Sequence, residues 1–141
     1  SEMCIRDREQ VLALHAAQVG PEPVLFRAPG GNYAKYQKHE VGWPLIQWSS
    51  SAGDTGKNTE RQLARHLTAN AEDGSILLLH DIYMKTAVSA EEYLAEFYQR
   101  GFLTATVEEL LSLAGLEPEP NEVYVSVPTA FTTGGIPDGA L

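Results

Sequence analysis

Residues 75–82 read Ser-Ile-Leu-Leu-Leu-His-Asp-Ile, and this stretch decides how the chain is expected to fold. The apolar run Ile76–Leu79 follows a turn pair at residues 73–74, a pattern typical of a short buried strand. The strand brings His80 to its carboxyl end. A histidine there can act as a general acid, because imidazole exchanges its proton near neutral pH. The alternative is a histidine that caps the strand end with a purely structural hydrogen bond.

Strands and helices alternate on both sides of this stretch. Apolar periodicity and turn residues predict helices over 9–18, 33–41, 59–72, 89–100 and 107–113, and strands over 24–26, 44–48, 75–79 and 103–106. Thr59 and Ser89 are the expected N-caps of two helices, and Gly101 is expected just after the end of the second. Residues 49–58 are expected to form a loop, and residues 118–141 an irregular tail. The alternation predicts an α/β fold with parallel strands.

Two further polar residues are expected near strand ends, where parallel sheets collect their functional side chains. Arg27 follows the strand over 24–26, and a guanidinium can orient a carboxylate through two parallel hydrogen bonds. Asp54 could orient a histidine in the way that the acid of a catalytic triad does. The alternatives are a surface arginine at residue 27 and a simple turn residue, next to Gly53, at residue 54.

Glycines and tryptophans in the same region are candidates for contact with a ligand. Gly30 and Gly31 permit a positive φ and a close approach of the backbone to a ligand, although such a pair is also an ordinary turn. Trp43 and Trp48 flank the strand over 44–48, and aromatic rings of this kind can stack on sugars. For at least one of the two tryptophans the alternative is packing in the core.

Composition excludes several classes of protein. The chain has 141 residues, 43% hydrophobic and 21% charged, as expected for one globular domain. Its formal net charge of −9 argues against a nucleic-acid partner. No apolar run approaches the ~20 residues of a membrane span, and the first ten residues lack the apolar core of a secretion signal. The single cysteine, Cys4, excludes an internal disulfide framework and a cysteine-rich zinc site.

The first residues match a sequence that is not expected in a natural protein. Residues 3–8, MCIRDR, are what one reading frame of a transposon-end sequencing adaptor encodes. We interpret residues 1–8 as a non-native leader joined to a truncated gene. The alternative is an ordinary polar start to the helix over 9–18, and the nucleotide sequence would distinguish the two.

Three stretches taken together resemble the motifs of a known family. Phe26–Gly31 (FRAPGG) resembles the third motif, R-P-P-Y-G, of the polysaccharide deacetylase family, also called the NodB-homology domain and carbohydrate esterase family 4. Trp48–Thr55 resembles the segment with its fourth motif, D-x-x-D-W, and Gly74–Ile82 is similar to its fifth, L-x-L-H-D. The resemblance covers about residues 9–127. It implies a partial, distorted (β/α) barrel with parallel strands and outer helices, in which residues 9–117 form the C-terminal half of the domain.

The resemblance also implies a reaction, the hydrolysis of N-acetyl groups on amino sugars of peptidoglycan, chitin or a related polysaccharide. His80 would be the general acid that protonates the leaving amine, and Asp54 would hold its imidazole. Arg27 would pair with the catalytic-base aspartate. A divalent metal, usually zinc in the family, would polarise the amide carbonyl and the attacking water.

Substrate contacts follow from the same resemblance. The backbone N–H at Gly30 would bind the oxyanion, Leu78 would line the pocket for the acetyl methyl group, and Trp48 would contact the sugar. The sequence departs from the family at some of these places. Gly30 stands where the third motif has tyrosine, and Ser51 and Thr55 replace the first aspartate and the tryptophan of the fourth motif.

Two motifs of the family are missing from the sequence. The first, T-F-D-D-G, carries the base and one metal ligand, and the second, H-x-x-x-H, carries two more ligands. No Asp-Asp pair and no histidine pair at that spacing occurs in the chain. We therefore expect both motifs upstream of residue 9 in a parent enzyme. The chain itself is expected to bind no metal and to be catalytically silent.

The parent protein is expected to be an exported enzyme, extracellular or on the cell surface, with a polysaccharide as its substrate. A carbohydrate-binding pseudoenzyme of the same fold is the alternative, and the full-length gene would decide between them. A signalling or nucleotide-binding α/β module is disfavoured, because no glycine-rich phosphate loop follows a predicted strand.

Overall fold

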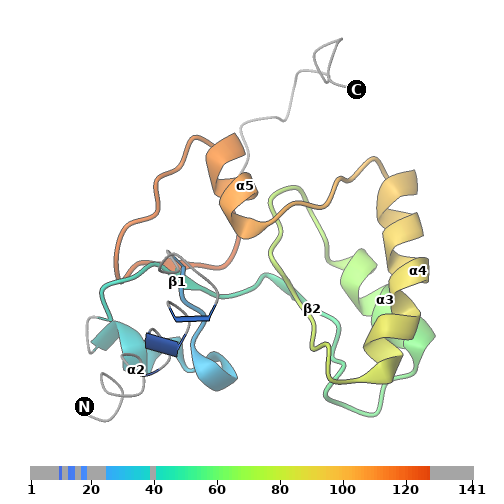
Figure 1. The fold of residues 1–141 in the computed structure, drawn as a ribbon. Helices are drawn as coiled ribbons and strands as arrows, with labels where there is room; N and C mark the ends of the chain where they lie inside the picture. Colours follow the sequence, from blue (N-terminus) through green and yellow to red (C-terminus); the bar gives the residue numbers. More distant parts are fainter. Residues whose placement is uncertain (1–9, 11–12, 15–16, 19–24, 39–40, 128–141) are drawn as a thin grey trace. The chain divides into compact units, whose positions relative to one another are not determined.

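The computed structural model describes residues 10, 13–14, 17–18, 25–38 and 41–127 (Figure 1). Its elements in chain order are η1 (Pro29–Gly31), α2 (Tyr33–Lys38), β1 (Leu45–Ile46), β2 (Ser50–Ser51), α3 (Glu60–Ala69), β3 (Leu77–Leu78), α4 (Met84–Gln99), α5 (Val107–Leu113) and β4 (Val123–Tyr124). The chain divides into a first unit, Ser1–Ser49 with Glu117–Ser126, and a second unit, Ser50–Leu116 with Val127–Leu141. Within the described ranges no helix has both the length and the apolar character needed to cross a membrane.

The first unit is organised around β1. This strand pairs in parallel with β4, so that Leu45 lies opposite Val123 and Ile46 opposite Tyr124. Phe26 forms a parallel bridge to Leu45. Leu45 is fully buried because it has an extended segment on each side. The strand β4 lies in a segment that we expected to be irregular, and its pairing with β1 is what gives it regular structure.

Aromatic rings pack the helix α2 onto this sheet. The ring centroid of Phe26 lies 5.1 Å from that of Tyr36 in α2 and 6.1 Å from that of Trp43, both in tilted arrangements. Trp43 therefore has the packing role that we gave as one alternative. The helix predicted over 33–41 is present as α2, and residues 39–40 lie outside the described residues. The helix predicted over 9–18 also lies largely outside them, although residues 10, 13–14 and 17–18 are helical.

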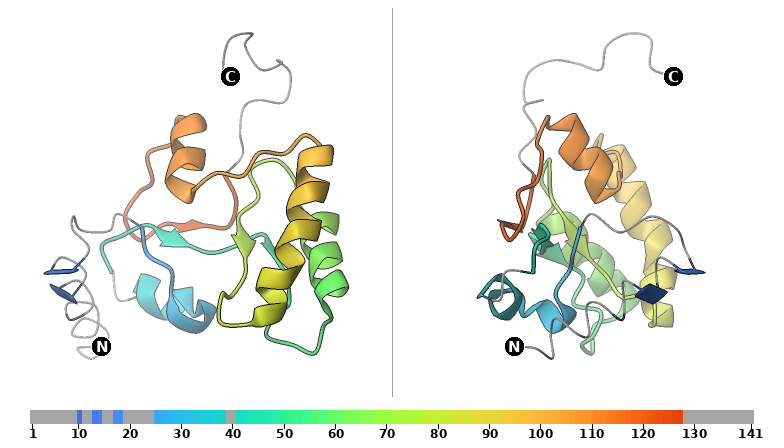
Figure 2. Two further views of the ribbon diagram at one scale, coloured as in Figure 1. Left: turned by 45° about the vertical axis from the view of Figure 1, so that its right-hand side comes forward. Right: turned by 60° about the vertical axis from the view of Figure 1, so that its left-hand side comes forward.

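The second unit combines a parallel strand pair with two packed helices. Ser50 of β2 lies opposite Leu77 of β3, and Ser51 lies opposite Leu78. Helices α3 and α4 lie side by side (Figure 2). Leu63 and Leu67 of α3, one turn apart on one face, point into the core. The buried cluster consists of Ala52, Leu63, Leu67, Ala71 and Phe97.

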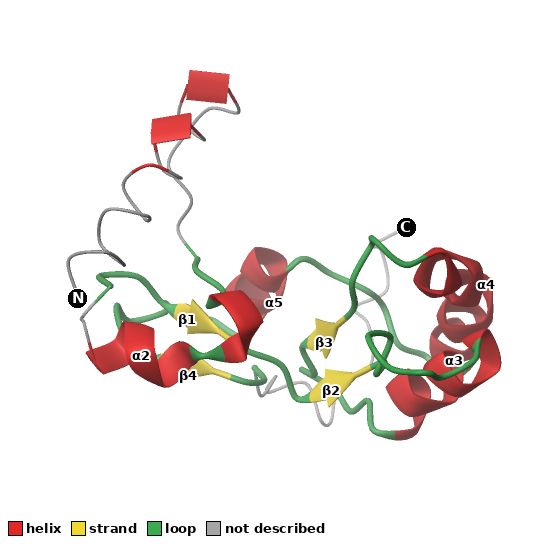
Figure 3. Cartoon of the chain, turned by 90° about the horizontal axis from the view of Figure 1, so that it is seen from below, coloured by secondary structure: helices red, strands yellow, loops and turns green. Residues whose placement is uncertain are grey.

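Parallel pairing is common to both units, as Figure 3 shows for the four strands. All strand pairs formed by the described residues are parallel. Helices lie in the sequence between the two strands of each pair, so the predicted α/β class is confirmed. The strands predicted over 44–48 and 75–79 are present as β1 and β3. The prediction that residues 49–58 form only a loop is wrong, because Ser50-Ser51 pairs with β3 although its side chains carry no apolar signal.

The start of α4 and the end of α3 differ from the prediction, since α3 ends at Ala69 and not at residue 72. Thr59 is the N-cap of α3, as predicted. The predicted N-cap at Ser89 is wrong, because α4 begins at Met84 and its N-cap is Tyr83. Ser89 lies inside the helix, where its buried hydroxyl donates to the Thr86 carbonyl at 2.9 Å instead of capping the helix end. Gly101 follows the end of α4 with φ +81°, as predicted.

The strand predicted over 103–106 is also wrong. These residues form neither helix nor strand, and Leu103 is 83% exposed. A strand is stabilised by its partner, and no strand in the described part of the chain pairs with this segment. Residues 103–106 instead connect α4 to α5, which covers the predicted range Val107–Leu113.

Candidate functional site

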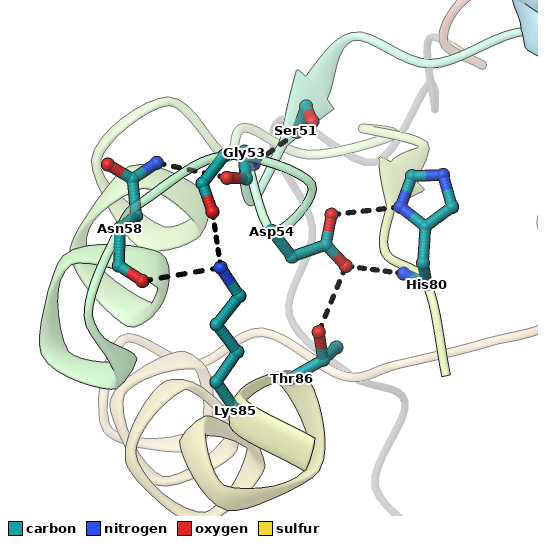
Figure 4. A network of polar contacts seen from close by, with 8 residues as sticks. Ser51, Gly53, Asp54, Asn58, His80, Lys85 and Thr86 are labelled. Carbon is teal, nitrogen blue, oxygen red and sulfur yellow. Dashed lines mark hydrogen bonds and ion pairs between the residues drawn. The ribbon is translucent and has the colours of Figure 1, made fainter. Parts of the chain in front are cut away.

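Two parallel strands bring Asp54 and His80 together (Figure 4). Asp54 follows β2 and His80 follows β3, and the carboxyl ends of paired parallel strands lie at one edge of the sheet. The His80 Nδ1 atom lies 2.9 Å from Asp54 Oδ1. The backbone N–H of His80 donates to Asp54 Oδ2 at 2.5 Å. The contact that we predicted between these two side chains is therefore present.

The Asp54 carboxylate is buried and receives hydrogen bonds from several donors. Its side chain is 1% exposed. A third donor, the Thr86 hydroxyl, lies 3.0 Å from Oδ2. Burial raises the pKa of Asp54, but the hydrogen bonds from His80 and Thr86 and the charge of His80 outweigh it, so the pKa lies below its ordinary value. Asp54 is consequently an ionised acceptor beside the imidazole.

The imidazole of His80 has one nitrogen toward Asp54 and one away from it. An ionised carboxylate only accepts hydrogen bonds, so Nδ1 must carry a hydrogen and donate it to Asp54 Oδ1. This leaves Nε2 as the nitrogen that can exchange a proton with a ligand. The side chain of His80 is 38% exposed, which gives a ligand access to it. The ring of Tyr83 lies edge-on, with its centroid 6.2 Å from that of the imidazole.

Side chains also close the turn that carries Asp54. Gly53 has φ +65°, and a Cβ there would lie 2.8 Å from Asn58 Nδ2, so this position favours glycine. Asn58 Nδ2 donates to the Gly53 carbonyl at 3.0 Å, and Lys85 Nζ donates to the Gly56 carbonyl at 2.6 Å. The segment around Asp54 is thus held by a hydrogen bond within it and by one from Lys85 at the start of α4, as Figure 4 shows.

Sequence reasoning missed Thr86 and Lys85, the two residues of α4 that contact this region. Both lie in the first turn of the helix. The sequence predicts the start of this helix at Ser89, so both residues lie outside the predicted range. The signal that could have found them is the run Met84–Val88, which contains no glycine or proline to keep it out of the helix.

Arg27 lies in the first unit, where its guanidinium contacts the neighbouring strand β1 and the residue after it. Nε donates to the Ile46 carbonyl at 3.3 Å and Nη2 to the Gln47 carbonyl at 3.2 Å. Burial lowers the pKa of Arg27 from its ordinary value. The two bonds fix the side chain at the end of β1. Its convergence with Asp54 and His80 stays a prediction.

The two glycines of the turn over Pro29–Gly31 differ in the space that a Cβ atom would have. Gly30 has φ +61°, and a Cβ there would meet no atom within 4 Å. Gly31 has φ +71°, and a Cβ there would lie 2.7 Å from Trp48 Cη2. The half-buried Trp48 therefore packs directly on this turn. In the second unit, Leu78 is half-buried in β3, and its carbonyl accepts from the Ala52 N–H at 3.2 Å.

A metal ion would need a group of ligands that the described residues do not form. No three side chains of His, Cys, Asp or Glu in this part of the chain lie close enough together to hold one. Both oxygens of Asp54 are already engaged by His80 and Thr86. The described donor set therefore does not fit a metal centre by itself.

Comparison with known proteins relates the chain to bacterial deacetylases. It is 34% identical over 93 residues to the peptidoglycan-N-acetylglucosamine deacetylase PgdA of Listeria monocytogenes, covering 66% of this chain and 20% of that protein. It is 34% identical over 98 residues to the peptidoglycan-N-acetylglucosamine deacetylase of Bacillus cereus, covering 64% of this chain and 46% of that protein. The chain thus spans less than half the length of either relative. No family model matches it.

The fold is shared with solved structures of the same kind. A family 4 acetyl xylan esterase from Clostridium thermocellum, solved in complex with a cobalt ion, superimposes with a TM-score of 0.74 at 24% identity. The match covers 85% of this chain and 61% of that one. At this identity the match shows the common fold. Sequence and fold agree, and the chain belongs to the polysaccharide deacetylase family, whose domain is also called the NodB-homology domain or carbohydrate esterase family 4.

Proposed function

We propose that this chain forms the general-acid side of the active site of a polysaccharide N-deacetylase, a hydrolase that releases acetate from N-acetylated sugars of peptidoglycan or a related polymer. The observation that carries the proposal is the pairing of His80 with the buried Asp54 at the end of two parallel strands. The names of the Listeria and Bacillus relatives support peptidoglycan as the polymer. Such a substrate places the parent protein at the cell wall, outside the cell or on its surface.

Hydrolysis of an amide needs a proton on the departing nitrogen. Water adds to the acetyl carbonyl, the C–N bond breaks, and the products are acetate and a free amine. When Nε2, which points away from Asp54, also carries a proton, His80 donates it to that amine, and the catalytic-base aspartate takes a proton from the attacking water. Asp54 holds Nδ1–H and thereby keeps Nε2 toward the substrate. Uncatalysed expulsion of an unprotonated amine would be far slower, so the reaction depends on this pair.

The other proposed roles rest on the resemblance of the motifs to those of the family. Arg27 pairs with the catalytic-base aspartate, and the Gly30 N–H binds the oxyanion. Leu78 lines the acetyl pocket and Trp48 the sugar-binding groove. A divalent metal of the family, when bound, polarises the carbonyl. The described residues do not form its ligand set.

A joined protein tests this proposal. Residues 9–127 would be fused behind the N-terminal part of the Bacillus cereus deacetylase, and acetate release from N-acetylglucosamine oligomers would be measured. We expect release by the joined protein and a loss of about 10²–10⁴-fold in His80→Gln. His66→Gln, a change at an exposed histidine of α3, should leave the rate unchanged. Binding of the oligomer without acetate release would favour the carbohydrate-binding pseudoenzyme instead.

A further inference from the structure

The proposed function uses Asp54 and His80 but gives no role to the third group that contacts the carboxylate, the Thr86 hydroxyl. We propose that Thr86 is a positioning residue, which fixes the orientation of the Asp54 carboxylate and through it the imidazole of His80. The inference rests on the proposed function for its catalytic consequence. Its structural part stands on the contacts of these three residues alone.

The donors to Asp54 come from two different elements. His80 provides two of the three contacts, one from its imidazole and one from its backbone N–H. Thr86 provides the third and lies on α4. Among the described residues, Thr86 is the donor that connects the Asp54 carboxylate to α4, whereas the other two contacts come from His80. Without Thr86, both remaining donors to the carboxylate would belong to His80, one from the backbone and one from the imidazole.

Thr86 is itself well fixed. It is 6% exposed, and its branched side chain has few rotamers in a helix. Its backbone N–H donates to the Tyr83 carbonyl at 2.9 Å, and its own carbonyl accepts from the buried Ser89 hydroxyl at 2.9 Å. The Thr86 hydroxyl is therefore presented to Asp54 from a rigid position. A donor of this kind selects one rotation of the carboxylate about its χ2 bond.

Removal of this hydroxyl has a specific consequence. In Thr86→Val, which preserves the shape of the side chain, Asp54 Oδ2 would keep only the His80 N–H as its partner. A buried carboxylate with fewer donors binds a proton more readily and rotates more freely. The Nδ1–H contact would then be populated for less of the time. Because Thr86 is buried and its hydroxyl is engaged with Asp54, we expect a fall in kcat of ~10-fold with little change in KM.

Three variants separate positioning from general destabilisation. Thr86→Val removes the hydroxyl, and Thr86→Ser keeps it while removing the methyl group. Thr68→Val is the matched control, because Thr68 is equally buried and its hydroxyl donates to the Ala64 carbonyl within α3 at 3.0 Å, not to Asp54. Thr86→Cys, whose thiol is a weak donor, is read in the same way if Thr86→Val does not fold.

The first measurement uses the chain itself and does not depend on activity. NMR of ¹⁵N-labelled histidine reports the tautomer of His80, and ¹³C-labelled aspartate reports the titration of Asp54. We expect Thr86→Val to lower the Nδ1–H fraction of His80 and to raise the midpoint of the Asp54 titration. Thr86→Ser and Thr68→Val should match the wild type. Wild-type signals of both His80 and Asp54 in Thr86→Val would overturn the proposal.

The second measurement is the rate of acetate release by the joined protein carrying the same variants. A fall in kcat in Thr86→Val, restored in Thr86→Ser and absent from Thr68→Val, supports the catalytic consequence. An equal fall in Thr68→Val would overturn it, because loss of packing would then be the cause. If the wild-type joined protein releases no acetate, the proposed function fails, while the NMR result still decides the position of the carboxylate.

Discussion

At residue 54 a carboxylate lies in the protein interior and is stabilised by its neighbours instead of by water. Burial of an unpaired carboxylate costs several kcal/mol, typically more than one hydrogen bond returns. Asp54 avoids this cost through three contacts, two from His80 and one from Thr86. Gly53, the residue before Asp54, has a positive φ, a backbone conformation that glycine adopts without steric cost.

The charge on Asp54 should make folding stability depend on pH. Its pKa is lower in the folded chain than in the unfolded chain, so the unfolded chain binds more protons at acidic pH. The resulting stabilisation is complete above the unfolded value of about 3.9 and is lost as the pH falls through the folded pKa. Asp54→Asn should remove this component of the acid dependence, and it should also lower stability at neutral pH.

Urea unfolding at a series of pH values would measure the effect. Asp81→Asn serves as the control, since it removes an exposed aspartate next to His80. Its free energy of unfolding should fall on acidification in the same way as that of the wild type. Equal acid dependence in Asp54→Asn and the wild type would contradict the hydrogen-bonded state of the buried carboxylate.

The contacts of some site residues could be predicted from the sequence, and those of others could not. The contact of Asp54 with His80 was predicted from the resemblance of the motifs to the deacetylase family, whereas the strand β2 that precedes Asp54 was not predicted. Thr86 was not predicted, since its contact arises only once α4 starts five residues before Ser89. The N-cap Tyr83 makes no side-chain capping hydrogen bond, so the sequence carries no capping signal at the start of α4.

At the scale of elements, α3 is the helix that holds the second unit together. It contributes Leu63 and Leu67 to the core, and it begins with a capping box. The Thr59 hydroxyl accepts from the Gln62 N–H, and the Gln62 side chain accepts from the Thr59 N–H at 2.9 Å. Two N–H groups at the helix start are satisfied in this way.

Thr59→Ala should therefore destabilise the chain by about 1 kcal/mol, the usual cost of losing a side-chain N-cap. Urea unfolding followed by the helical signal would measure it. Thr104→Ala is the matched control, because Thr104 is exposed and lies outside helices and strands. If both variants unfold at the wild-type urea concentration, the capping box contributes nothing to stability.

Elements with a strong local signal were foreseen, and those formed by tertiary contacts were not. The helices α3 and α5 carry their own caps, and β3 carries its own apolar run. Ser50-Ser51 has no such signal and becomes a strand because β3 lies beside it. Leu103 has the signal but no partner strand in the described residues, so no strand forms. In both cases the presence or absence of a partner strand decided whether a strand formed, and a single sequence does not show which segments pair.

At the scale of the whole molecule, the chain should bind zinc weakly and release no acetate by itself. A catalytic zinc normally needs three protein ligands, and the described residues contain no group of that size. Without such a metal, the attacking water keeps a pKa near its bulk value. Calorimetric titration with zinc and an acetate assay would test both statements. Tight zinc binding with zinc-dependent acetate release by the chain alone would contradict them.

The two neighbouring glycines of η1 have different evolutionary freedom. At Gly31 a Cβ would lie 2.7 Å from Trp48 Cη2, so a side chain there requires the indole to move as well as a left-handed backbone. At Gly30 the space is open, and the cost of a side chain is confined to backbone strain of about 1–2 kcal/mol. A single codon change at residue 30 can therefore alter the surface of the turn while its shape is inherited intact.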